Sequence, residues 1–150
     1  MNKVLMIAVL GVLTTLSACK KDKDPSAEAI QLGKLSDTWL LTSVTKDDTE
    51  KSGYQNFTLT LSGSTSADHF TYATSGRPDL SPWPVGGTWS FGNVNTQIIR
   101  DPNTAHELFI SYTLTNSTLT MKFVFSGEGY ENNGRVNSSE GSWIFTFNKQ

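Results

Sequence analysis

The sequence predicts an all-β fold of about eight antiparallel strands that close into an up-and-down barrel. The body of the chain is rich in Thr, Ser, Gly and aromatic residues. Apolar residues alternate with polar ones in stretches such as Phe57–Ser62 and Leu108–Leu114, which is the pattern of half-buried strands. No Cys–Trp–Cys pattern marks an immunoglobulin-type sandwich. The barrel is therefore favoured, and a β-sandwich is the alternative.

The expected strands differ in how regular their alternation is. One short helix is expected at Ser26–Lys34, with Ser26 as its N-cap, and because it is too short to be stable alone it should pack on the sheet and plug one end. The clear strands are Phe57–Ser62, Leu108–Leu114, Leu119–Phe125 and Trp143–Phe147, and the less regular ones are Thr38–Thr45, Phe70–Thr74, Thr88–Phe91 and Thr96–Arg100.

The N-terminus is typical of an export signal. Lys3 precedes an apolar run from Val4 to Leu13, which is shorter than the roughly 18 residues that a membrane span needs. Leu16-Ser17-Ala18-Cys19 resembles the lipobox of bacterial lipoproteins, and this resemblance implies cleavage before Cys19 and lipidation of its sulfur. The alternative is an ordinary secretory signal that ends beside a cysteine.

Three segments follow from this interpretation. Residues 1–18 are the signal peptide, residues 19–36 a lipid-anchored charged tether with the short helix, and residues 37–150 a single β-barrel domain. Lys20 stands at the position where many lipoproteins of the inner membrane carry aspartate. The resemblance therefore implies the outer membrane. The charged stretch after it is similar to tethers that lead to the cell surface, and equally fits a solvated linker.

Composition and motifs exclude several classes of function. Removal of Lys3 with the signal changes the formal charge from −2 to −3, and no basic stripe accompanies the aromatic residues, which argues against nucleic acid as a partner. His69 and His106 lie in no zinc-binding spacing. No nucleophile elbow, phosphate loop or dinucleotide fingerprint is present. We therefore expect no metal, no cofactor and no catalytic residues.

Thr38-Trp39, together with a closing strand that ends in Phe145-Thr146-Phe147-Asn148-Lys149, resembles lipocalins and lipocalin-like bacterial lipoproteins. Asp37 stands where the lipocalin glycine usually lies. This resemblance implies an up-and-down barrel that binds a small apolar molecule. Lipocalins proper are longer, and a shorter barrel is either hollow or filled by its own side chains.

The connections between strands predict where a site would lie. In a meander they fall alternately at opposite ends, and here the second, fourth and sixth are compact, whereas the first, third, fifth and seventh are mostly longer and richer in unusual side chains. Binding residues commonly sit on such loops. The residues expected to gather at this loop-rich end are Tyr54, Arg77, Trp83, His106, Tyr130 and Arg135.

Trp83 stands out among them because Pro82 and Pro84 flank it and stiffen the backbone. Its ring is either displayed, where it could stack on a glycan or cover an apolar ligand, or folded inward, where it would seal the barrel mouth. The first strand starts at the compact end, so the tether from Cys19 should emerge there and the loop-rich end should point away from the membrane.

Three functional classes remain open. The first is a non-catalytic, lipid-anchored module that binds a small apolar molecule or glycan, which predicts an inward-facing cavity. The second is a protein-interaction module, such as an accessory subunit, adhesin or inhibitor, which predicts a filled barrel. The third is an enzyme, which would need titratable side chains that converge in a cleft. The partner protein is not identified by the sequence.

Overall fold

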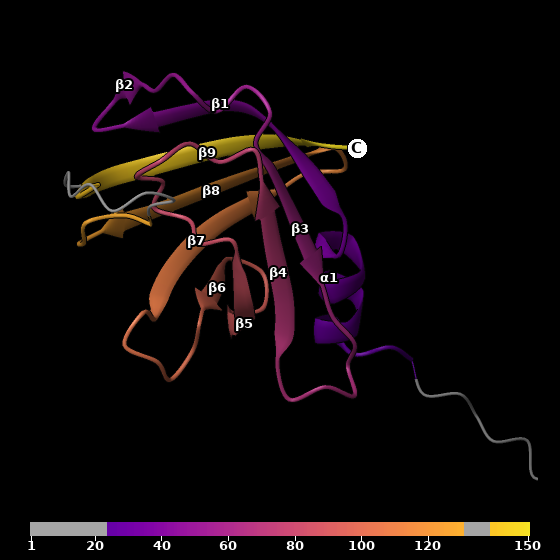
Figure 1. Ribbon diagram of the computed structural model, residues 1–150. Helices are drawn as coiled ribbons and strands as arrows, with labels where there is room; N and C mark the ends of the chain where they lie inside the picture. The colour runs from indigo at the N-terminus through magenta and orange to yellow at the C-terminus, as the bar shows by residue number, and fades with distance from the viewer. Residues whose placement is uncertain (1–23, 131–138) are drawn as a thin grey trace, which may run out of the picture.

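The computed structural model describes residues 24–130 and 139–150 and shows a closed antiparallel barrel (Figure 1). Each barrel strand pairs with the next along the chain, and β9 pairs back with β1 from Trp39↔Lys149 to Lys46↔Trp143. A two-residue strand, β2 (Thr49–Glu50), folds back and pairs antiparallel with the end of β1. The eight barrel strands in the described part of the chain are β1 (Thr38–Lys46), β3 (Thr58–Ser62), β4 (Phe70–Ser75), β5 (Gly86–Asn93), β6 (Gln97–Arg100), β7 (Leu108–Leu114), β8 (Thr118–Phe125) and β9 (Gly141–Lys149). The predicted barrel is confirmed.

Alternation of burial explains why these residues form strands. In β4 every second side chain from Phe70 to Thr74 is buried, and those between are exposed. The outward positions are mostly Ser and Thr, which suit a pleated, half-solvated surface. Some of them pair across strands, as Thr58 and Ser75 do with their hydroxyl oxygens 2.7 Å apart.

The helix α1 (Ala27–Leu35) closes one end of the barrel (Figure 1). Ser26 caps it by accepting a hydrogen bond from the Ala29 amide at 3.1 Å. Its inward face carries Leu32 and Leu35, and the Leu35 carbonyl accepts a hydrogen bond from the Trp39 indole at 2.9 Å. The helix thus packs on the barrel as predicted. In the described part of the chain, no helix has the length and apolar character to cross a bilayer.

The connections differ between the two ends as the meander predicts. At the α1 end, Gln31 donates a hydrogen bond to the Tyr112 hydroxyl at 2.9 Å, and that hydroxyl donates to the Val94 carbonyl in the β5–β6 turn. The long connections lie at the opposite end, where Ser81 and Tyr130 form an isolated β-bridge. We call this opposite end the loop-rich end.

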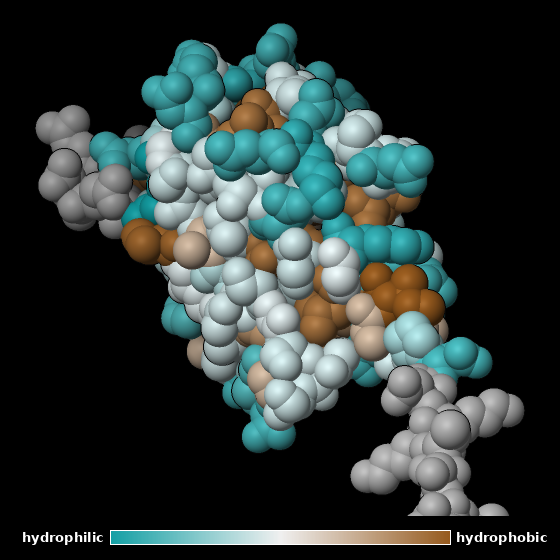
Figure 2. Space-filling view, turned by 90° about the vertical axis from the view of Figure 1, so that its right-hand side faces the viewer, coloured by the Kyte–Doolittle hydropathy of each residue, from teal (hydrophilic) through white to brown (hydrophobic). Residues whose placement is uncertain are grey.

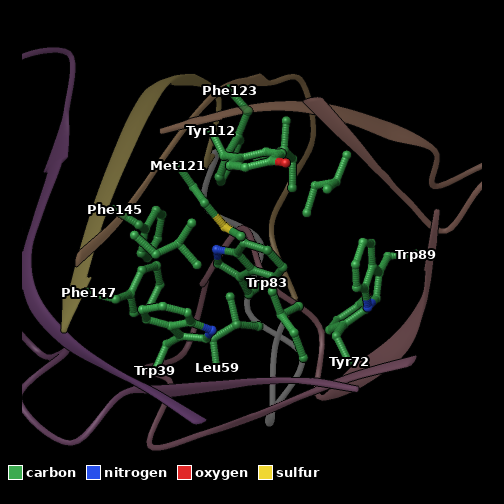
Figure 3. Packing of buried hydrophobic residues seen from close by; sticks show 14 of the residues in the cluster. Trp39, Leu59, Tyr72, Trp83, Trp89, Tyr112, Met121, Phe123, Phe145 and Phe147 are labelled. Carbon is green, nitrogen blue, oxygen red and sulfur yellow. The ribbon is translucent and has the colours of Figure 1, made fainter. Parts of the chain in front are cut away.

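The interior of the barrel is occupied by side chains. Figure 3 shows Trp83 in the middle of the barrel, surrounded by residues from several strands. The largest fully buried side chains include the indoles of Trp39, Trp83 and Trp89 together with Phe57, Phe145 and Phe147. Aromatic rings of this size account for much of the apolar area that such a small domain can bury.

Candidate functional site

The loop between β4 and β5 enters the barrel mouth and carries Trp83 with it. Ser81, Pro82 and Trp83 are all buried, and only 1% of Trp83 is exposed. Its ring packs edge-on against Tyr72 and Phe123, with centroids 5.7 and 5.9 Å away. The displayed ring that the flanking prolines suggested is therefore not what the structure shows, because the loop turns inward and the indole seals the mouth.

This packing leaves the Trp83 indole nitrogen without a hydrogen-bond partner among the described residues, although the atom is fully buried. In Figure 3 the nitrogen lies on the side of the ring that faces Met121. A buried donor without an acceptor lowers stability by about 1–3 kcal/mol. The packing of the ring therefore has to outweigh this loss.

Arg100, at the end of β6, holds the loop that carries Trp83 in place. Its guanidinium carbon contacts the faces of two rings, 5.4 Å from the Trp83 centroid and 5.6 Å from that of Tyr130. Nη1 donates to the Pro82 carbonyl at 2.7 Å, and Nη2 to the Tyr130 hydroxyl at 3.4 Å. Because only 1% of Arg100 is exposed, these contacts replace the hydration of Nη1 and Nη2, whereas Nε is buried without a hydrogen-bond partner among the described residues.

Asp101 supplies the opposite charge, with Oδ2 3.5 Å from the Arg100 Nε. The same carboxylate accepts hydrogen bonds from the Tyr72 hydroxyl at 2.8 Å and from the Thr88 amide at 3.0 Å. Burial is the main cause that raises the pKa of Tyr72; the Arg100 charge opposes this rise, and the hydrogen bond to Asp101 adds to it. We call Arg100, Asp101, Tyr72, Trp83 and Tyr130 the Arg100 cluster.

The other predicted residues join this end in different ways. Arg77 donates a hydrogen bond from Nη1 to the Tyr130 carbonyl at 2.8 Å. Tyr54 is buried against Phe57 and Phe145; burial raises its pKa, while a hydrogen bond with Ser81 and the Arg77 charge oppose the rise. Arg135 lies outside the described residues. The structure therefore brings Tyr54, Arg77, Trp83 and Tyr130 to one end.

Open grooves lie around these residues. One groove of about 310 Å³ and another of about 270 Å³ both include His106 and Tyr130 in their walls. A groove of about 580 Å³ and one of about 290 Å³ share Lys51, Ser52 and Tyr54. The loop-rich end therefore carries two pairs of grooves, one bordered by Tyr130 and one by Tyr54, around a sealed mouth.

Titratable groups do not form a metal site in the part of the chain that the structure describes. No three His, Cys, Asp or Glu side chains gather there closely enough to hold an ion. Arg100 and Asp101 at the mouth pair with each other and with neutral partners. Their contacts serve to hold the loops.

No family model matches this chain, and searches of curated proteins and of solved structures found no match either. The barrel part of the lipocalin-like expectation is confirmed, whereas the resemblance to lipocalins stays a prediction.

Arg100 and Asp101 were missed as site residues because the sequence shows them only as the end of one strand and the start of a loop. The alternation of inward and outward positions along β6 could have identified Arg100. Ile98 and Arg100 are separated by two positions, so they share the inward face of β6, and both are buried. An arginine at an inward position needs partners inside the barrel.

Replacing Trp83 tests whether packing of its ring in the barrel mouth stabilises the fold. Trp83→Ala should lower the free energy of unfolding by about 3–5 kcal/mol, because a large buried ring leaves a cavity. Val85→Ala, at a side chain 63% exposed two residues further on, should change it by less than about 0.5 kcal/mol. Urea unfolding followed by circular dichroism measures both variants. Equal effects would show that the Trp83 ring contributes little packing.

Alkaline pH should destabilise the fold. Burial raises the pKa of Tyr54, Tyr72 and Tyr112 above the usual value of 10.0. Above about pH 10 the unfolded chain releases these protons and the folded chain keeps them, so the free energy of unfolding falls as pH rises.

Urea midpoints between about pH 9 and pH 11 measure this loss. The Tyr72→Phe variant should lose less stability over the same interval. A midpoint that stays constant across the window in the unaltered protein would contradict the argument.

Proposed function

We propose that the protein is a non-catalytic, lipid-anchored module of the cell envelope that recognises another protein at its loop-rich end. The observation that carries this proposal is the filled barrel. Trp83 occupies the mouth and α1 covers the opposite end. The barrel then acts as a rigid scaffold, and recognition falls to the loops and edges that surround the mouth.

An apolar ligand inside the barrel is the less favoured alternative. Ligand sites are concave and usually preformed, with volumes of about 300–1,000 Å³. Such a volume inside this barrel would require the loop that carries Trp83 to leave the mouth. The Arg100 guanidinium would then lose its bond to the Pro82 carbonyl and its contact with the Trp83 ring, which makes opening unfavourable.

The surface supports a macromolecular partner at the loop-rich end better than at the α1 end. Grooves that border Tyr54 and Tyr130 give a partner protein recesses into which its side chains can fit. Figure 2 views the side on which α1 lies, and there the described surface is mostly hydrophilic to neutral, with apolar residues in separate small groups.

The anchor orients this surface in the proposal. A lipid on Cys19 would hold the protein on the outer membrane, in the periplasmic or the surface-exposed leaflet. The described chain enters the barrel through α1, and the grooves lie at the far end. A partner that approaches from solvent would therefore meet the loop-rich end first.

A glycan is the second candidate partner. The rings of His106 and Tyr130 lie edge to face with centroids 6.0 Å apart, beside a groove that Glu107 and Glu128 also line. Aromatic faces and carboxylates together suit a sugar, which presents apolar C–H faces and hydroxyl donors.

The anchor predicts a simple labelling result. Cys19→Ser should abolish incorporation of a radiolabelled fatty acid into the protein, because no thioether-linked lipid can form. Ser17→Ala, which keeps a small residue before the cysteine, should still incorporate the label. Autoradiography of the immunoprecipitated protein measures this, and label retained by Cys19→Ser would contradict the anchor.

Photo-crosslinking in cells that make the protein tests the recognition surface. A photoreactive phenylalanine at exposed Ser52 or His106 should form a protein adduct, and one at exposed Asn116, at the α1 end, should not. An adduct at position 106 that stains for carbohydrate would favour the glycan. Adducts only from position 116, or from none of the three, would overturn the proposed surface.

A further inference from the structure

The strand β1 changes partners part-way along its length. On one side it pairs with β9 from Trp39 to Lys46. On the other side it pairs with β3 only over Thr38–Leu40 and with β2 only over Thr45–Lys46. Figure 1 shows β1 leaving β3 and running above β9 toward β2. On the side away from β9, residues 41–44 therefore have no neighbouring strand among the described residues.

Two backbone hydrogen bonds close the ends of this open edge. The Leu41 amide donates to the Phe57 carbonyl at 3.1 Å, and the Lys51 amide donates to the Val44 carbonyl at 3.0 Å. In an antiparallel ladder, the amide and the carbonyl of one residue face the same side. The Leu41 carbonyl and the Val44 amide therefore face the open side, where no described backbone group pairs with them.

A bulge explains why these two groups are three residues apart. The register with β9 shifts between Leu41 and Ser43, and the extra residue, Thr42, donates its hydroxyl to the Thr146 carbonyl at 2.9 Å. An extra residue of this kind bends and twists its strand. It turns β1 away from β3 and leaves the gap.

The open edge lies in the groove of about 580 Å³ described above. Val44 and Tyr54 are buried and half-buried Leu41 lies beside them, so the floor is apolar. Tyr54 is held by edge-to-face contacts with Phe57 and Phe145, whose ring centroids are each 5.6 Å from its own. The exposed residues Lys51, Ser52 and Gln55 form the opposite wall.

These features select the kind of occupant. The wall holds one carboxylate, Glu50, and one ammonium, Lys51, so the charge of the groove favours an uncharged segment over a polyanion. The edge is recessed between β3 and the segment 50–55. A second barrel, with its own edge equally recessed, could not reach it. A single extended segment is thin enough to reach this edge.

We infer that residues 41–44 are a docking site for strand addition, in which an extended, uncharged segment of a partner protein lies in this groove. Its backbone donates a hydrogen bond to the Leu41 carbonyl and accepts one from the Val44 amide, and one small apolar side chain faces Leu41, Val44 and Tyr54. At about 3.3 Å per residue, three or four extended residues span the gap. This inference rests on the proposed function and names its mode of recognition.

Displayed random peptides of about seven residues, selected on the full-length protein, supply the probe. The best binder is then resynthesised with single N-methyl groups at successive positions. Because alternate amides of a strand face opposite sides, methylation of the amide that faces β1 should weaken binding at least tenfold. Methylation of the next amide should leave it nearly unchanged. Insensitivity at every position would overturn strand addition.

A groove-filling variant locates the site. Ser52→Trp should weaken the same peptide at least tenfold, and Ser64→Trp, at an exposed serine in the β3–β4 connection, should not. Circular dichroism checks that both variants fold. Equal binding by Ser52→Trp and the unaltered protein would overturn the inference, as would dimerisation that Ser52→Trp abolishes, since a second copy would then be the occupant.

The two proposals fail separately. If the photo-crosslink at position 106 forms in cells and persists in Ser52→Trp, the loop-rich end recognises its partner without the β1 edge. In that case the proposed function stands and strand addition is wrong. If the crosslink at position 106 is lost in Ser52→Trp and retained in Ser64→Trp, both proposals are supported.

Discussion

The buried guanidinium of Arg100 is the constraint on which the loop-rich end depends. A charge that is 1% exposed is tolerated only when hydrogen bonds, an opposite charge or aromatic faces replace its water. Here the replacement groups come from two distant segments, Pro82 with Trp83 and Tyr130, and from the adjacent residue Asp101. One side chain at the end of β6 thus fixes the β4–β5 loop and the first part of the β8–β9 connection. The sealed mouth follows from this arrangement.

A sealed mouth changes what the fold can do. An up-and-down barrel of this size either holds one small ligand or fills its interior with side chains, and this one is filled by Trp39, Trp83 and Trp89 with the phenylalanines of β9. Its specificity then has to come from the rim and wall, where loops and strand edges carry groups that the core does not use. The positions of Tyr54 and Tyr130 illustrate this, since each is packed on the core and borders an open groove.

Prediction from the sequence succeeded where local chemistry decides the structure. Alternation in residues 108–125 and the Ser26 cap depend on near neighbours, so the strands and α1 were visible. The inward turn of Trp83 was left as one of two alternatives, because the prolines beside it restrict the backbone without setting its direction. The roles of Arg100 and Asp101 and the bulge at Thr42 were not predicted, because each depends on partners distant in sequence, such as Tyr130 and Thr146.

The bulge at Thr42 creates the open edge at residues 41–44 of β1. Closing a sheet into a barrel removes free edges, and free edges invite uncontrolled pairing between chains. Here the open stretch is confined to residues 41–44 and flanked by the charged pair Glu50 and Lys51. Its backbone groups lie in a groove rather than on a rim. The recess that protects this edge from other barrels is the same feature that admits a thin extended segment, so protection and recognition arise from one piece of geometry.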